Sequence, residues 1–132
     1  MNKKAKEIMN TKLETISPNA TVYDAIEKLI DKRIRSLLVV PENNEDEYGV
    51  VTIRNIIFNV IIPEIDPKNI KIKEIASRPV IAVSKDTHIN EIYFLMKTNN
   101  IARVFVKEDE RIIGVISFFD LLNYILVEKA KS

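Results

Sequence analysis

Two pairs of side chains stand out as possible chemistry, because each joins a hydroxyl to a polar group three residues later. They are Ser117 with Asp120, and Thr52 with Asn55. A carboxylate in the first turn of a helix is favoured by the helix dipole, and a charged hydrogen-bond acceptor contributes about 1.5–3 kcal/mol against about 0.5–1.5 for a neutral one. Asp120 is therefore the strongest candidate for holding a polar ligand, although it could equally serve only as a helix cap, and Ser117 could equally be an outward strand residue.

The sequence offers little catalytic chemistry beyond these pairs. It contains one histidine, His88, no cysteine and only two glycines. An enzyme needs a positioned nucleophile, an acid–base pair or a metal, and neither a phosphate-binding nor a dinucleotide-binding glycine motif is present. We expect a protein that is not an enzyme, with no catalytic residues, no metal and no required cofactor. His88 falls at a predicted helix start, where a capping or surface role is expected.

The two pairs belong to an internal repeat. The segment Gly49–Ile57 recurs as Gly114–Leu122, 65 positions later, whereas upstream equivalents such as Ile8 and Ile75 are 67 positions apart. The two-residue difference falls in the acidic loop Pro41–Tyr48, where an insertion costs little. Because a unit of about 60 residues is marginal alone, the two copies are expected to pack on each other.

Each copy is predicted to contain the elements β-α-β-β-α. The clearest helix is Thr21–Lys32, which has an apolar stripe and a capping box formed by Thr21 and Asp24. The equivalent helix in the second copy should begin after a cap at Asp86 or Thr87 and end near Asn99. The other expected elements are strands at 15–16, 36–40, 48–52, 82–83, 103–106 and 112–117, helices at about 54–61 and 119–127, and short helical openings at 5–9 and 71–76.

Composition narrows the class of protein. The chain has 132 residues and 46% hydrophobic content, which suits one soluble compact domain. Its formal charge of +1 gives no indication of a nucleic-acid partner. The absence of cysteine and of a leader or membrane-spanning segment leads us to expect a cytoplasmic location. Abundant isoleucine, lysine and glutamate are typical of a thermophile, or equally of an AT-rich genome.

The ordered motifs, occurring twice, resemble the cystathionine-β-synthase (CBS) domain family in a tandem pair. The family pattern is a short opening ending in Ile-Met-Thr, a strand, a helix with a buried alanine, an Ile-x-Arg-Leu-Pro-Val-like strand, and Gly-x-x-Thr-x-x-Asp at the last helix. The first copy matches with Ile8-Met9-Asn10-Thr11, Ala25, Ile34 to Val39 and Gly49 to Asn55, and the second with Ile75-Ala76-Ser77, Val80 to Ser84, Ile101 to Val106 and Gly114 to Asp120.

The resemblance implies an α+β fold in which two β-α-β-β-α repeats pack about a pseudo-two-fold axis. It divides the chain into repeat 1 at 1–62, a linker at 63–70 and repeat 2 at 71–132. It also implies a regulatory module that binds AMP, ADP, ATP or S-adenosylmethionine in a cleft between the repeats and acts on a separate partner protein. Such pairs commonly form homodimers, and Phe119 in place of Arg54 suggests an apolar contact surface.

The resemblance also assigns roles within the expected clefts. Asp120 and Ser117 would meet the ribose, with Thr52 and Asn55 as weaker counterparts because Asn55 replaces the aspartate. Arg103 would face the phosphates. The remaining candidate ligand-binding residues are Arg35 and Ser36 at the equivalent place in repeat 1, and Arg78, Val80, Lys12, Leu13 and Ile16 around the base. Any one of the basic residues could instead be a solvated surface charge.

Two other classes of function stay open. The chain could be a dimeric interaction scaffold that does not respond to ligand, which Asn55 favours and Asp120 with Arg103 opposes. A nucleic-acid-binding protein is the weakest alternative, since the charge is only +1.

Overall fold

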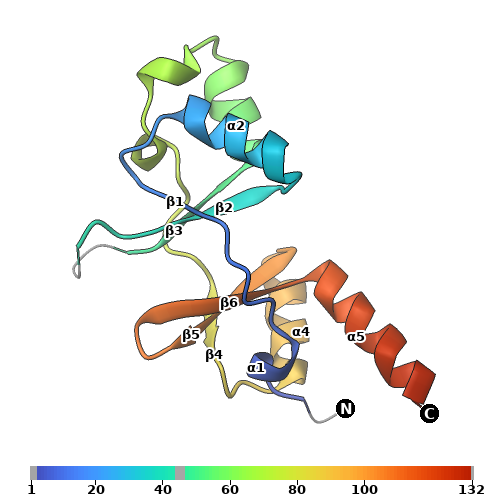
Figure 1. Ribbon diagram of the computed structural model, residues 1–132. Helices are drawn as coiled ribbons and strands as arrows, with labels where there is room; N and C mark the ends of the chain where they lie inside the picture. Colours follow the sequence, from blue (N-terminus) through green and yellow to red (C-terminus); the bar gives the residue numbers. More distant parts are fainter. Residues whose placement is uncertain (1–2, 44–46, 132) are drawn as a thin grey trace. The chain divides into compact units, whose positions relative to one another are not determined.

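A computed structural model describes residues 3–43 and 47–131 of the chain (Figure 1). The chain forms two compact units that do not follow its order. Unit 1 comprises Met1–Leu13 and Ile81–Ser132, and unit 2 comprises Glu14–Val80. Each unit contains helices and one three-stranded sheet, which confirms the predicted mixture of helix and strand.

The sheet of unit 2 has the strand order β1 (Thr15–Ile16), β2 (Ser36–Val39) and β3 (Gly49–Thr52). The strand pair β1–β2 is parallel and the pair β2–β3 is antiparallel, with Ser36 opposite Thr52. The crossover between β1 and β2 is made by α2 (Val22–Lys32). The predicted capping box of this helix is confirmed: Asp24 N donates to Thr21 Oγ1 at 3.1 Å, and Thr21 N donates to Asp24 Oδ2 at 3.0 Å.

After β3, the chain of unit 2 continues in helical turns. These are α3 (Ile53–Ile56), the π-helical turn η1 (Ile57–Ile61), and the 3₁₀ turns η2 (Pro67–Asn69) and η3 (Ile72–Glu74). The predicted helix at 54–61 is therefore present, but its second half is widened to π geometry. The predicted loop Pro41–Tyr48 includes residues 44–46, which lie outside the described residues.

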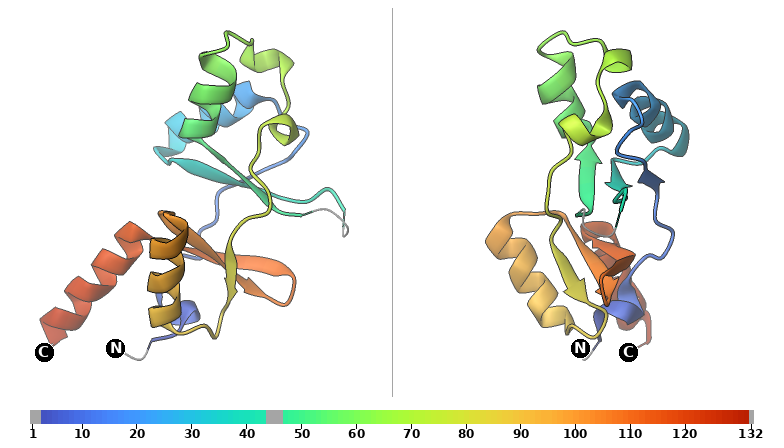
Figure 2. Two further views of the ribbon diagram at one scale, coloured as in Figure 1. Left: turned by 180° about the vertical axis from the view of Figure 1, so that it is seen from behind. Right: turned by 90° about the vertical axis from the view of Figure 1, so that its left-hand side faces the viewer.

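Unit 1 repeats the same topology. Its strands are β4 (Ala82–Ser84), β5 (Arg103–Glu108) and β6 (Arg111–Ser117), with β4 parallel to β5 and β5 antiparallel to β6. Its helices are α1 (Ala5–Ile8), α4 (Ile89–Asn99) and α5 (Phe118–Lys131). The left view of Figure 2 shows α5 continuing directly from the end of β6.

The start of α4 decides between the predicted caps. The cap is His88, whose Nδ1 accepts a hydrogen bond from Asn90 N at 3.3 Å, which confirms the capping role expected for His88 and shows that Asp86 and Thr87 were wrong as candidate caps. The predicted end is confirmed, because α4 stops at Asn99 and Asn100 adopts a left-handed conformation with φ of 51°. Asparagine tolerates this conformation better than most residues, so it ends the helix at little cost.

The opening segment of each repeat packs on the unit formed by the other repeat. In unit 1, Asn10 forms a two-bond antiparallel bridge with Val115, at 2.8 and 3.0 Å. In unit 2, Ser77 forms the equivalent bridge with Val50, at 2.9 and 3.0 Å. The repeat boundaries 1–62, 63–70 and 71–132 stay a prediction from the sequence, and the compact units of the structure do not follow them, because each unit contains the opening segment of the other repeat.

This exchange reaches into both cores. Ala5 is fully buried in the core of unit 1, and Ile72 is fully buried in the core of unit 2. The unit 1 core also contains Val83, Ile89, Ile92, Met96, Val104, Val106, Ile116 and Leu121. The unit 2 core also contains Ile16, Val22, Ala25, Leu29, Leu37, Val39, Val51, Ile56 and Val60.

None of the helices in the part of the chain that the structure describes is both long and apolar enough to cross a bilayer.

Candidate functional site

Asp120 occupies the first turn of α5 and is tied to the residue that ends β6. Its Oδ2 accepts two hydrogen bonds from Ser117, one from the backbone N at 2.8 Å and one from Oγ at 2.9 Å. Asp120 N in turn donates to Ser117 Oγ at 3.2 Å. The helix-capping role that the sequence left open is therefore real, and it engages one carboxylate oxygen.

Arg103 begins β5 directly opposite Ser117 in the β5–β6 register. Side chains of directly opposed residues lie on the same face of a sheet, so the guanidinium and the capped carboxylate are carried at the same end of these strands. Phe118 N also donates to Ala102 O at 3.1 Å, which fixes the start of α5 to the residue before Arg103. Both Arg103 and Asp120 are half-buried. Unit 1 thus carries Arg103 and the Ser117–Asp120 pair at the same end of the β5–β6 strand pair.

Unit 2 holds the equivalent residues in the same arrangement with different chemistry. Ser36 lies opposite Thr52, as Arg103 lies opposite Ser117. Thr52 N donates to Asn55 Oδ1 at 3.0 Å, and Asn55 N donates to Thr52 Oγ1 at 3.0 Å. Arg35 is exposed, and its carbonyl accepts a bond from Ile53 N at 3.1 Å. The unit therefore keeps the helix cap but has an amide where unit 1 has a charged acceptor.

Arg78 packs its side chain over Gly49, the first residue of β3. A Cβ on Gly49 would lie 3.1 Å from both Cγ and Nε of Arg78. Val80, which ends unit 2, is half-buried. The structure thus places Arg78 beside β3, in the unit that also holds Thr52 and Asn55.

The remaining predicted residues lie just before and just after Glu14, where the chain passes from unit 1 into unit 2. Lys12 and Leu13 end the first segment of unit 1; Lys12 is exposed and its backbone N donates to Asn10 Oδ1 at 2.9 Å. Ile16 is buried in the core of unit 2. The twelve candidate residues thus divide between the two units: Asp120, Ser117, Arg103, Lys12 and Leu13 belong to unit 1, and the other seven belong to unit 2.

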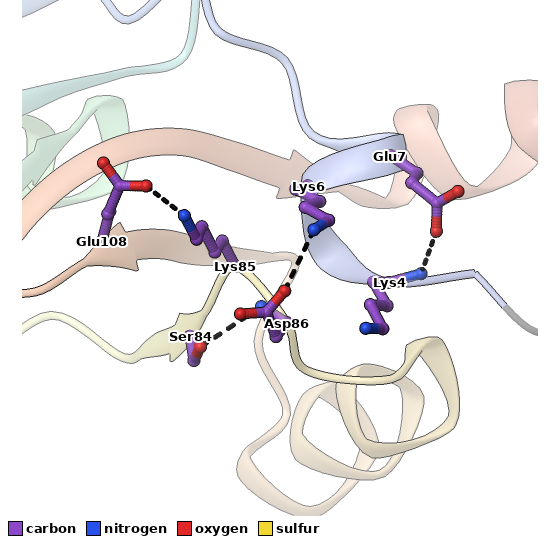
Figure 3. A network of polar contacts seen from close by, with 7 residues as sticks. All are labelled: Lys4, Lys6, Glu7, Ser84, Lys85, Asp86 and Glu108. Carbon is purple, nitrogen blue, oxygen red and sulfur yellow. Dashed lines mark hydrogen bonds and ion pairs between the residues drawn. The ribbon is translucent and has the colours of Figure 1, made fainter.

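Sequence reasoning missed a polar network that attaches the opening segment of unit 1 (Figure 3). Lys6 Nζ lies 3.2 Å from Asp86 Oδ1, and Lys85 forms an ion pair with Glu108. Glu7 Oε2 accepts a hydrogen bond from Lys4 N at 2.8 Å. We call this group of residues the clasp.

The clasp lowers the pKa of three carboxyl groups. The hydrogen bond from Lys6 lowers the pKa of Asp86, the hydrogen bond from Lys85 lowers the pKa of Glu108, and the Lys4 backbone hydrogen bond lowers the pKa of Glu7. The sequence does contain one difference between the repeats that could have indicated the clasp. The positions equivalent to Lys85, Asp86 and Glu108 in repeat 1 are Pro18, Asn19 and Pro41, so repeat 1 lacks these charges.

The described residues also contain no group of three or more His, Cys, Asp or Glu side chains placed to hold a metal ion.

Comparisons with known proteins agree with the repeat. A family model described as "CBS domain" matches residues 5–61 and 72–127. An uncharacterised protein of Methanocaldococcus jannaschii is 29% identical over 109 residues, which are 82% of this chain and 59% of the relative. Another from Methanopyrus kandleri is 29% identical, and the match covers 60% of that relative. The chain thus spans about three fifths of the length of these two proteins.

An enzyme is also among the relatives. The inosine-5'-monophosphate dehydrogenase of Methanocaldococcus jannaschii is 33% identical over 123 residues, but the match covers only 23% of that protein. Among solved structures, the hexameric CBS-CP12 protein from bloom-forming cyanobacteria has a TM-score of 0.83 at 33% identity, over 92% of this chain and 67% of that one. A conserved CBS domain protein from Thermoplasma acidophilum has a TM-score of 0.83 at 26% identity, over 94% of this chain and 70% of that one.

Proposed function

The chain belongs to the CBS-domain family, with one copy in each repeat, and on that premise we propose that it is a regulatory, non-enzymatic module for an adenosine-containing ligand. The ligand is AMP, ADP, ATP or S-adenosylmethionine. Binding shifts the population of conformations of the chain and so modulates a separate partner protein. The size of this shift is limited by the difference in the ligand's affinity for the two conformations.

The proposal is carried by the arrangement of Asp120 and Arg103 at one end of the unit 1 sheet. A carboxylate accepts hydrogen bonds from sugar hydroxyls, and a guanidinium meets phosphate or carboxylate oxygens with its planar fork. A ribose bearing an anionic group needs both. In unit 2, Asn55 supplies a neutral amide at the equivalent place, so we expect the Asp120 site to bind ligand more tightly.

Isothermal titration calorimetry tests this function. The freshly purified chain is first analysed by mass spectrometry for bound small molecules, and is then titrated with AMP, ADP, ATP and S-adenosylmethionine. We expect at least one ligand to bind, and Asp120→Ala to weaken binding by about ten- to a hundredfold through loss of a charged hydrogen bond. Asn55→Ala should weaken it less. Equal losses would defeat the asymmetry of the two sites.

We also propose that the chain acts as a homodimer through α5. Phe119, Leu122 and Leu126 form a stripe at three- and four-residue spacing and are 77%, 70% and 69% exposed. Phe118 and Val127 are exposed beside this stripe. Five such side chains on each of two copies, at roughly 100 Å² each, amount to about 1,000 Å², which is the size expected of a specific interface. The hexameric state of the CBS-CP12 relative supports an oligomer.

Sedimentation equilibrium of Leu122→Lys tests the dimer. We expect the wild type to be dimeric and this variant to be monomeric, because a lysine would be buried against the second copy. Ile30→Lys is the matched control, since Ile30 is 69% exposed on α2. A dimer that survives Leu122→Lys would rule out this surface.

The second candidate function is a dimeric scaffold that does not respond to ligand. Asn55 in place of an acidic residue favours it, and so does the apolar stripe of α5. If no ligand binds to protein that is free of copurified small molecules, while Leu122→Lys still dissociates the dimer, the scaffold is the better description.

A further inference from the structure

Residues 3–10, which we call the strap, are held to unit 1 by backbone hydrogen bonds that recur in unit 2. The counterpart of the strap is the segment 70–77. Each segment takes part in the same five bonds to its own unit, all between 2.8 and 3.0 Å. The donors are the amides of Ala5, Lys6, Asn10, Ile89 and Val115 in unit 1, and of Ile72, Lys73, Ser77, Val22 and Val50 in unit 2. The backbone attachment is therefore matched, and the two segments differ in their side chains.

The strap has a smaller apolar anchor than its counterpart. Ala5 is the fully buried residue of the strap, whereas Ile72 is the fully buried residue of the counterpart. Lys3 stands where Ile70 packs against the unit 2 core. Met9, which replaces a smaller alanine, works in the opposite direction. Because stabilisation grows with the apolar area removed from water, the two isoleucines hold the counterpart more firmly.

Charged side chains supplement the smaller anchor in unit 1 (Figure 3). Lys6 Nζ lies 3.2 Å from Asp86 Oδ1, and the Lys85 carbonyl accepts a hydrogen bond from Lys6 N. The Lys85 side chain is in turn paired with Glu108. In unit 2 the residue equivalent to Lys85 is Pro18, whose ring fixes φ covalently. The loop that receives the strap is thus braced by an ion pair, and the loop that receives the counterpart is braced by a ring.

Salt acts differently on these two kinds of attachment. The four charged side chains of the clasp's ion pairs are between 35% and 51% exposed. Dissolved ions screen exposed charges, and the screening length falls from about 10 Å at 0.1 M salt to about 3 Å at 1 M. Buried isoleucine side chains and a proline ring carry no charge to screen. Sodium chloride should therefore weaken the attachment of the strap and leave that of its counterpart largely unchanged.

We propose that the clasp makes the strap a salt-sensitive switch: residues 3–10 detach from unit 1 as one piece while the rest of the unit stays folded, and salt promotes this release. Segments with few buried apolar contacts open locally at a lower free energy than global unfolding. The strap bridges β6 at Val115, two residues before Ser117, so its release removes a support from the strand that leads into the candidate site. Attached and released straps are two states of unit 1, which any molecule that prefers one of them can bias.

Native-state hydrogen exchange of the full chain, followed by NMR, tests the switch. The five amides of the strap's bonds are compared with the five matched amides of unit 2 in 0.1 M and 1 M sodium chloride, at one pH and temperature. We expect the strap's amides to share one opening equilibrium and to be less protected than Ile116 in the core. Their exchange should rise about three- to tenfold between the two salt concentrations. The matched amides of unit 2 should change less than about twofold.

Variants at the ion pair separate the clasp from a general effect of salt. Asp86→Asn installs the residue that repeat 1 has at the equivalent position 19. Asp86→Asn and Lys6→Gln should each raise strap release at 0.1 M salt about two- to fivefold and reduce its salt dependence. Lys6→Asp combined with Asp86→Lys reverses the pair and should restore both. Lys73→Gln, at the position equivalent to Lys6, is the matched control and should change neither.

Three results would overturn the inference. Strap amides as protected as Ile116 would show that the strap is not released by itself. An equal salt dependence in the strap and its counterpart, or one that persists undiminished in Asp86→Asn, would show that the clasp is not its cause. Each result leaves the proposed function untouched, because no ligand enters the measurement. Thermal unfolding of each variant confirms that the protein compared is folded.

Discussion

Met9 lies directly over Gly114, so closely that a Cβ on residue 114 would come 2.6 Å from Met9 Sδ. Neither described glycine has a positive φ, so residue 114 is glycine to make space and not to relieve the backbone. The contact joins the opening segment of repeat 1 to β6, next to the Asn10–Val115 bridge. It gives the first prediction.

Gly114→Ala should destabilise the chain by about 1–3 kcal/mol, because the added methyl overpacks the contact with Met9. Met9→Ala combined with Gly114→Ala should recover part of this loss, since it removes the sulfur and the Cγ. Gly49→Ala is the control; its Cβ would lie 3.1 Å from the flexible Arg78 side chain and 3.2 Å from the Ser77 carbonyl oxygen, both longer than the 2.6 Å at residue 114, so we expect a smaller effect. Urea unfolding of the double-mutant cycle measures the coupling, and strictly additive effects would contradict the contact.

The clasp makes stability depend on pH. Because the pKa values of Asp86, Glu108 and Glu7 are lowered in the folded state, these groups stabilise it above their unfolded pKa values, near 4. This contribution is lost as the pH falls through that range towards the lowered pKa values. All three carboxylates are solvent-exposed, so the effect on the melting temperature should be at most a few degrees.

Lys6→Gln tests the clasp by thermal unfolding from pH 7 to pH 2.5. The variant should melt below the wild type at pH 7, and the difference should shrink in acid and in high salt. Lys73→Gln is the control, because Lys73 is equivalent to Lys6 but forms no ion pair within the described parts of the chain. A difference for Lys6→Gln that is the same at every pH would show that the charge of Asp86 is not its cause.

The exchanged opening segment gives a prediction for unit 2. Ile72→Ala should cost about 2–5 kcal/mol, because it removes a fully buried side chain from the core and leaves a cavity. Ile30→Ala, at a position 69% exposed on α2, should change stability by about 0.5 kcal/mol or less. Denaturant unfolding measures both. In amide spectra, the Ile72→Ala shifts should extend to Val22 and Val60 of the same core, and shifts confined to repeat 2 would contradict the exchange.

The cap of α2 can be tested by itself. Thr21→Ala removes the hydroxyl that accepts Asp24 N and should destabilise the chain by about 1 kcal/mol. Thr98→Ala, inside α4, removes a threonine without a capping role and should be neutral or slightly stabilising, since alanine is the better helix former. If both variants have the same stability, the capping box does not contribute.

The local features of this fold could be predicted from the sequence. The Thr21–Asp24 box and the Ser117–Asp120 pair were visible because helix capping depends on residues three positions apart. For α4 the sequence offered Asp86, Thr87 and His88 as possible caps and could not choose among them, because serine, threonine and aspartate are the usual caps and histidine is not. The last helix runs to Lys131 and not to Val127, and the basic residues Lys129 and Lys131 suit its C-terminal end.

The long-range features could not be predicted in the same way. Nothing near Ser77 indicates that it pairs with Val50 and not with a residue of its own repeat. The burial of Ala5 and Ile72 likewise depends on which unit receives each opening segment. The two glycines are the one sequence feature related to this packing, because each lies where the opening segment of the other repeat passes close to a strand.

The exchange of opening segments between the units determines whether one repeat could fold without the other. A fragment cut at the sequence boundaries would carry an opening segment suited to its neighbour and would lack the one that completes its own core. A molecule that contained a single repeat could fill that gap only by borrowing the segment from a second molecule. If two such molecules exchanged their opening segments, they would form the same pair of units that this chain forms within itself.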